Sequence, residues 1–222
     1  MLKKAPIIIL LFFASKSVFG QNFRFGILFN PAITWLQSDV NDVVPNNVRL
    51  GFDLGMSVDY FFAQNYAFAT GISMFNTGGT LNYVKGIEKF RLRGENVGIA
   101  PNSDVKYKMQ YIKVPVAFKF KTHLIGRMVY SANLGFDIMA RASANADFRD
   151  NTGVKYEKVN ANREINFLNL GWHFGGGASY SLGGDAAIFG GLAFMSTFTD
   201  LTAPEHDMIT SKNIIFRIGV LF

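Results

Sequence analysis

The sequence of 222 residues contains no cysteine, and this absence excludes several kinds of site. A disulfide scaffold, a thiolate zinc site, a cysteine nucleophile and a lipid-modified N-terminal cysteine all need that side chain. Charged residues are also few, at 17 %, against roughly 25 % in an average soluble domain. The longest apolar run, Ala5–Ala14, is too short for a membrane-spanning helix, which needs roughly 20 residues.

Apolar and small residues, by contrast, are abundant. Hydrophobic residues make up 49 % of the chain, which includes 23 Phe and 22 Gly. This composition excludes intrinsic disorder, because a disordered chain combines low hydrophobicity with high charge. The length suits one domain, whose apolar surface must be buried by something other than a spanning helix.

The first twenty residues have the order of features of a secretory signal peptide. Lys3 and Lys4 precede the apolar stretch Ile7–Phe13, and Val18–Gly20 forms a small-x-small cleavage site. We therefore expect residues 1–20 to be a signal peptide and residues 21–222 to be the mature domain. Removing Lys3, Lys4 and Lys16 lowers the formal charge from +6 to +3, and we expect no nucleic-acid partner.

The mature region alternates apolar and polar residues with a period of two, as β-strands with one apolar face do. Val48, Leu50 and Phe52, for example, alternate with Arg49 and Gly51. A bulge near Gln110 would reconcile two halves of one segment that alternate in opposite phase. The alternation predicts eight strands, at about residues 23–35, 48–60, 66–77, 106–121, 127–141, 165–180, 186–199 and 213–222.

The connections between these strands alternate between short and long. Three are short turns, at 63–65, 122–126 and 181–185, and the others are long, at 37–47, 78–105, 142–163 and 200–211. This layout predicts an all-β fold: an eight-stranded antiparallel up-and-down transmembrane β-barrel with short periplasmic turns and long extracellular loops. Aromatic residues near the strand ends, among them Trp35 and Tyr111, indicate interfacial girdles.

The polar positions of the strands favour a membrane barrel over a soluble one. They are mostly small residues with isolated charges, which suits a narrow lumen, whereas a water-facing surface would be dense in Lys and Glu. We expect a structural polar network in the lumen. Its members are Arg24, Arg49, Asp53, Asp59, Lys113, Lys119, Asp137, Arg141, His173 and Arg217.

The last strand carries alternate apolar residues that end in Phe. This pattern resembles the signal that the outer-membrane assembly machinery recognises, although a Phe-rich chain can also end this way by chance. The residues of the pattern are Ile214, Phe216, Ile218, Val220 and Phe222.

The three histidines give little support to a chemical site. His123 falls in a predicted turn and His206 in a loop, while His173 can approach Asp137 or Arg141 in the lumen. We expect no catalytic residue, metal site or cofactor, and we interpret His173 as part of the lumen network. Gly175–Gly177 lacks the Lys of a phosphate loop, and we expect these glycines either to allow sharp coiling of the strand or to make room for a bulky lumen neighbour.

The segment Tyr111–Lys121, with Pro115 inside an apolar strand, resembles the fourth strand of the Bacteroidota outer-membrane β-barrel family, which includes the PorT-like proteins. Lys113 stands where that family commonly has Glu. The resemblance implies the outer membrane of a Gram-negative bacterium, a bulge at Pro115, and for PorT-like members an association with type IX protein secretion.

Together these observations predict a non-enzymatic outer-membrane barrel, PorT-like, that acts as an accessory of protein secretion or envelope assembly. Two alternatives stay open: an outer-membrane enzyme with a histidine at its rim, and a narrow pore for small solutes. The expected partners are membrane lipid and lipopolysaccharide, the barrel-assembly machinery during biogenesis, and secretion-system proteins.

Overall fold

The computed structural model describes residues 22–92, 95–150, 152–202 and 208–222. The expected signal peptide and His206 lie outside these ranges. No helix in the described part of the chain is long and apolar enough to span a membrane.

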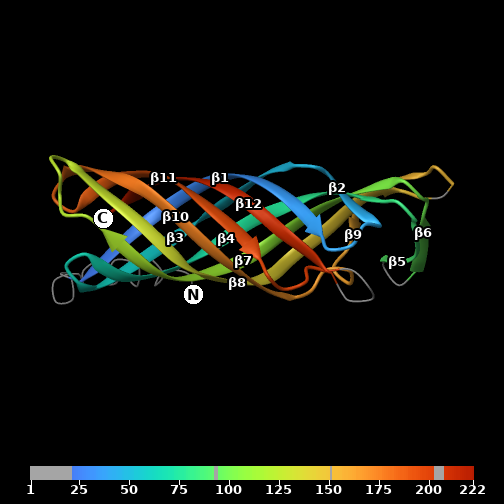
Figure 1. The fold of residues 1–222 in the computed structure, drawn as a ribbon, viewed down its shortest axis with the longest axis horizontal. Coiled ribbons are helices and arrows are strands. Elements are labelled where there is room, and N and C mark those ends of the chain that lie inside the picture. The colour runs from blue at the N-terminus through green and yellow to red at the C-terminus, as the bar shows by residue number, and fades with distance from the viewer. Residues whose placement is uncertain (1–21, 93–94, 151, 203–207) are drawn as a thin grey trace, which may run out of the picture.

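Eight long antiparallel strands form a closed barrel (Figure 1). Pairing of β12 with β1 and of β8 with β10 leaves no open edge in the wall. This confirms the predicted eight-stranded transmembrane barrel. The wall strands are β1 (Phe23–Ser38), β3 (Arg49–Ala63), β4 (Tyr66–Tyr83), β7 (Ser103–Lys121), β8 (Met128–Arg149), β10 (Leu168–Gly183), β11 (Ala186–Thr197) and β12 (Ile209–Leu221).

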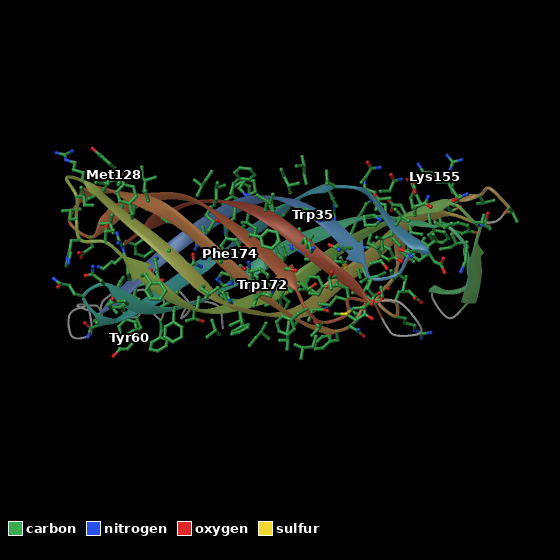
Figure 2. The ribbon with its side chains drawn as sticks, viewed as in Figure 1. Trp35, Tyr60, Met128, Lys155, Trp172 and Phe174 are labelled. Carbon is green, nitrogen blue, oxygen red and sulfur yellow. The ribbon has the colours of Figure 1, made fainter. Side chains whose placement is uncertain are left out.

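Large apolar side chains cover the outside of the barrel, as the alternation predicts. Phe29, Phe118, Leu134 and Phe136 are each at least half exposed in the isolated chain, which places them against lipid. Figure 2 shows side chains projecting from the outer wall, with Tyr60 and Met128 near the end of the short turns and Lys155 at the opposite end.

The long connections contain more strand than the sequence predicts. Four short strands occur in them: β2 (Val43–Asn47), β5 (Ile87–Leu92), β6 (Glu95–Ile99) and β9 (Lys155–Asn160). β2 pairs with β4, β9 with β8, and β5 with β6, so the expected loops 78–105 and 142–163 are largely β-structure. We call β2, β5, β6, β9 and the adjoining ends of β4, β7 and β8 (78–83, 103–110 and 143–149) the extracellular extension; Figure 1 shows it at the end opposite the short turns.

The extension escaped prediction because its apolar face turns inward. On β4 and β7, Leu81, Tyr83, Val105 and Tyr107 are buried, while the positions between them are polar. Water replaces lipid on the outer face, so the apolar side chains lie on the inside, as in a soluble sheet. Tyr111 is likewise fully buried, so its expected place in an outer aromatic girdle is wrong.

A register shift between β7 and β8 occurs at Gln110, where the sequence predicts a bulge. The extra residue lies on β8, however: Gln110 pairs with Ser143 and Tyr111 with Arg141, which leaves Ala142 unpaired. The bulge therefore changes which positions of β8 face inward, and Tyr107 on β7 stays on the inner side with Lys113.

The bulge that the family resemblance implies at Pro115 is absent from the β7 register. Pro115 pairs with Asp137 of β8, and the pairing on either side of it keeps the same offset. Towards β4 the ladder breaks off between Thr70 and Ser73, and the Thr70 hydroxyl donates a hydrogen bond to the Pro115 carbonyl at 2.9 Å. The missing proline N–H faces this interruption, so no bulge is needed to accommodate the ring.

Candidate functional site

The inward-facing side chains fill the lumen in three layers, of which the first is charged. Lys113 Nζ lies 2.7 Å from Asp53 Oδ2, and Lys119 Nζ lies 2.5 Å from Asp59 Oδ2. Both pairs join β7 to β3 across the intervening β4. Lys113 is only 6 % exposed, so these are buried ion pairs in which loss of one partner leaves an uncompensated charge.

The far side of the charged layer is formed by β8, β10 and β12. His173 Nδ1 lies 2.8 Å from Asp137 Oδ2, which is one of the two partners that the sequence offers for His173. Arg217 donates a hydrogen bond to Asn133 Oδ1 at 2.8 Å, and its guanidinium lies 5.2 Å from the centre of the Phe189 ring.

Three of the predicted network residues do not join these side-chain contacts directly. Arg24 lies opposite Asp59 in the register of β1 and β3. Arg49 donates a hydrogen bond to the Thr77 carbonyl at 2.9 Å, and Arg141 binds the carbonyls of Asn162 and Ile165. Arg49 and Arg141 thus bind backbone carbonyls nearer the extracellular end, where period-two alternation alone cannot distinguish a lumen contact from a loop contact.

Small residues make room within the charged layer. A Cβ on Gly177 would lie 2.8 Å from the ring of Phe189, so this glycine accommodates a bulky lumen neighbour. A polar cavity of about 90 Å³ borders the ion pairs. Asn30 Oδ1, Asp53 Oδ1 and Ser73 Oγ are buried there without a hydrogen-bond partner, and the cavity has room for water to bind them.

The second layer consists of uncharged polar groups that the sequence analysis did not single out. Thr77 Oγ1 donates a hydrogen bond to Asn213 Oδ1 at 2.9 Å and lies 3.1 Å from Ser211 Oγ. Asn169 Nδ2 donates one to the Tyr111 hydroxyl at 3.3 Å. Each of these side chains is almost fully buried, and only their inward alternation in the sequence could have indicated the layer.

The third layer, which we call the apolar plug, lies at the extracellular end. Its large, fully buried side chains come from most of the wall strands, and the hydroxyl oxygens of Tyr83 and Tyr107 lie 2.8 Å apart within it. Burial raises the pKa of Tyr107 well above its ordinary value, so its hydroxyl stays neutral. The plug comprises Leu36, Phe75, Leu81, Tyr83, Val105, Tyr107, Met109, Tyr111, Met139, Met195 and Leu201. Its deepest members, Phe75, Met139 and Met195, pair in the strand register with Asp53, Lys113 and His173, so the plug reaches down to the charged layer.

The lumen geometry provides few groups for chemistry. No cluster of three His, Cys, Asp or Glu residues suited to a metal occurs in the described ranges. His123 lies in the turn between β7 and β8, far along the chain from the only other described histidine, His173. The pattern Ile214, Phe216, Ile218 and Val220 lies on the outer face of β12.

A closed barrel with an apolar outer band and a filled polar interior defines an integral outer-membrane protein. A family model described as "Outer membrane protein beta-barrel domain" matches residues 16–203. The chain therefore belongs to this outer membrane β-barrel family, and the protein is located in the outer membrane.

Several solved structures are similar to this chain at low sequence identity. Neisserial surface protein A is 12 % identical, with 89 % of this chain and 95 % of that chain covered and a TM-score of 0.47. The outer membrane protein OprG from Pseudomonas aeruginosa is 12 % identical, with 90 % and 94 % covered and a TM-score of 0.46. A major outer membrane protein from Thermus thermophilus is 10 % identical, with 90 % and 98 % covered and a TM-score of 0.48.

A search of curated proteins found no match to the chain.

Proposed function

We propose that this protein is a non-enzymatic, non-conducting outer-membrane barrel that acts through its extracellular extension. The observation that carries the proposal is the apolar plug, which fills the lumen at the extracellular end, where a pore would have to be open. In the finer form that the sequence resemblance suggests, the protein is a PorT-like accessory of type IX secretion or of envelope assembly.

The filled lumen argues against a narrow pore. Tyr107, Tyr111 and Met109 are at most 2 % exposed, so they pack against other side chains. Below them, Asp53, Asp59 and Asp137 face Lys113, Lys119 and Arg217, and this balanced set of charges holds the strands together. An ion crossing the barrel would have to separate these pairs and displace the plug, at a cost of several kcal/mol.

The contacts of His173 argue against the rim enzyme. The imidazole is 8 % exposed and binds Asp137 within the charged layer, beneath the plug. A general base must lie within hydrogen-bond reach of the proton that it removes. A substrate on the extracellular side would be separated from His173 by the packed side chains of the plug, of which Met195 pairs with His173 in the register of β10 and β11.

The extension supports a role in binding partners outside the membrane. Four short strands and the ends of three wall strands lie beyond the lipid-facing band. The barrel does not need these parts of the chain in order to close. We propose secretion-system or envelope-assembly proteins as the partners there. Membrane lipid and lipopolysaccharide surround the wall, and the barrel-assembly machinery would recognise β12 during biogenesis.

A test of the function compares the mature barrel with a variant whose β5–β6 hairpin is removed. Replacing residues 85–101 by an Asn-Gly turn joins β4 to β7 where Tyr83 already pairs with Ser103. Heat-modifiable gel migration checks that the variant folds. We expect pull-downs from native outer membranes to recover secretion or assembly proteins with the intact barrel and to lose them with the variant.

Two outcomes would contradict the proposal. One is the same partner list with and without the hairpin. The other is a steady conductance of the purified barrel in planar bilayers, which would require an open lumen. A His173→Ala strain, in contrast, should keep the phenotype of the wild type.

A further inference from the structure

The polar cavity of about 90 Å³ in the charged layer extends towards the periplasmic end of the barrel. Its lining includes His173 in the charged layer and Leu28 and Leu221 below it. Leu221 is the last residue but one and pairs with Gly26, near the start of β1, so this part of the lining lies close to the short turns. The apolar plug closes the lumen at the other end. The cavity is therefore a blind pocket that a ligand would enter from the periplasmic side, and we call it the periplasmic pocket.

The periplasmic pocket contains buried acceptors that have no partner among the described residues. Asn30 and Asp53 lie opposite each other in the register of β1 and β3 and are only 5 % and 4 % exposed. The Asn30 amide and the Lys113 ammonium both donate to Asp53 Oδ2, at 3.3 and 2.7 Å, and this leaves Asp53 Oδ1 free. Asn30 Oδ1 and Ser73 Oγ are free as well. Because a buried acceptor without a donor is costly, these oxygens favour a ligand that donates hydrogen bonds.

Arg217 lies next to these acceptors and has no carboxylate partner. The register of β1 with β12 keeps the same offset on both sides of an interruption at Pro31, and this offset places Arg217 opposite Asn30. The guanidinium donates a hydrogen bond to Asn133 but forms no ion pair with another described residue. Arg217, Asn30 and Asp53 therefore form a row across β12, β1 and β3, with about 5 Å between neighbouring Cβ atoms.

The charges around the periplasmic pocket restrict the class of ligand. The pocket is lined by equal numbers of carboxylates and permanent cations, namely Asp53, Asp59, Asp137, Lys113, Lys119 and Arg217. A ligand with a net charge of either sign would face like charges, and such contacts are costly. A zwitterion avoids this cost, because its cationic group can lie at the free oxygens and its anionic group at Arg217.

The volume of the periplasmic pocket restricts the ligand further. About 90 Å³ is the space of roughly three water molecules in the liquid. The smallest α-amino acid occupies a comparable volume, because its bonded atoms lie closer together than separate water molecules. Its ammonium and carboxylate groups are joined by one carbon, and the groups that would receive them, Asn30 and Arg217, are direct cross-strand neighbours.

We propose that the periplasmic pocket binds a small α-amino acid of the size of glycine. The ammonium group donates to Asn30 Oδ1 and Asp53 Oδ1, and the carboxylate accepts from Arg217, whose planar fork of donors matches two carboxylate oxygens. Water fills the pocket when the amino acid is absent. The proposal goes beyond the proposed function, because it gives the barrel a ligand on its periplasmic side that does not depend on the extracellular extension.

The test is a titration of the refolded mature barrel in detergent micelles, followed by backbone amide chemical shifts. The probes are glycine, glycinamide, which lacks the carboxylate, and acetate, which lacks the ammonium group. We expect saturable binding of glycine that is at least tenfold tighter than binding of either of the other probes, because only glycine presents both charges.

Arg217→Met is the decisive variant. We expect its affinity for glycine to fall at least tenfold, while its affinity for glycinamide stays equal or rises because a cation that repels this probe is gone. A misfolded barrel would lose both, and heat-modifiable gel migration checks the fold. Arg49→Met is the matched control: it removes the same charge from an arginine outside the pocket, which binds the Thr77 carbonyl, and should change the affinity for glycine less than twofold.

Three outcomes would overturn the inference. They are a wild type that binds none of the probes, so that the pocket holds water only, equal affinities for the three probes, and equal losses of glycine binding in the two arginine variants. The proposed function can fail separately, since a conducting barrel that still prefers glycine would contradict the closed lumen but leave the amino-acid site intact.

Discussion

The two ends of β7 obey opposite rules although the strand is continuous. In residues 111–121 the outward side chains are apolar and the inward ones include Lys113 and Lys119; in residues 103–110 the outward side chains include Lys106 and Lys108 and the inward ones are apolar. The difference follows from the solvent outside the wall, which is lipid for one part and water for the other. The same period of two thus describes two kinds of sheet, and the environment decides which face is apolar.

The largest expected change in the free energy of unfolding comes from breaking a buried ion pair in the membrane-spanning part of the barrel. Asp53→Ala leaves the Lys113 ammonium buried without its carboxylate, and we expect a loss of about 3–5 kcal/mol in the free energy of unfolding. Urea denaturation in lipid vesicles measures it. The double variant Asp53→Ala/Lys113→Met should recover most of the loss, and failure to recover it would show that the pair does not act as a unit.

A smaller change in stability should distinguish the lipid-facing part of β8 from its part in the extension, when an outward-facing residue is replaced by arginine. Leu134 and Asn145 both face outward on β8, the first in the lipid-facing band and the second in the extension. Leu134→Arg should cost about 2–4 kcal/mol, because the charge enters the bilayer, whereas Asn145→Arg should stay within about 0.5 kcal/mol. Equal costs in the same vesicles would mean that the band does not end where the polar positions begin.

The smallest effect is a dependence on pH that we expect in the extension. Burial raises the pKa of Asp147, but hydrogen bonds from Lys108 and the Lys158 amide, with the charges of Lys108 and Lys106, outweigh it, and the net pKa is lowered. A lowered pKa stabilises the fold above the unfolded-state value, and the contribution is lost as pH falls through the folded value.

Hydrogen exchange of the β9 amides measures this loss. Corrected for intrinsic rates, protection of the Lys158 amide should decrease as pH falls below about 4, the ordinary pKa of an aspartate, and Asp147→Asn should show no such decrease. Protection that stays constant in the wild type would contradict the role of the carboxylate.

The sequence predicted the membrane part of the fold well because lipid imposes a simple rule on it. Phe118 and Leu134 can only face outward in a barrel that crosses a bilayer, so alternation assigned both the strands and their orientation. The length of the strands was harder to predict. The sequence analysis ended them where the outer face becomes polar, and so missed the continuation of β4 to Tyr83 and of β8 to Arg149. Inward apolar side chains such as Leu81 resemble those of any soluble sheet.

The lumen was predictable residue by residue but not contact by contact. Alternation indicated that Lys113, Asp53 and His173 point inward. It could not indicate that Lys113 meets Asp53 across β4, because that contact depends on the stagger of three strands. The pairing of Arg149 with Lys155 was missed for the same reason, because the two become neighbours only when β9 folds back on β8.

The seam between β1 and β12 joins the two wall strands that lie furthest apart in the sequence. Phe25 and Phe222 exchange backbone hydrogen bonds of 2.8 Å, so one edge of β1 has no partner until the last residues of the chain are available. An unpaired edge is prone to pair with other chains, and in a bilayer its N–H and C=O groups have no water to bind. The ring therefore cannot close without β12, and a chain cut before Ile209 would leave edges of both β1 and β11 unpaired.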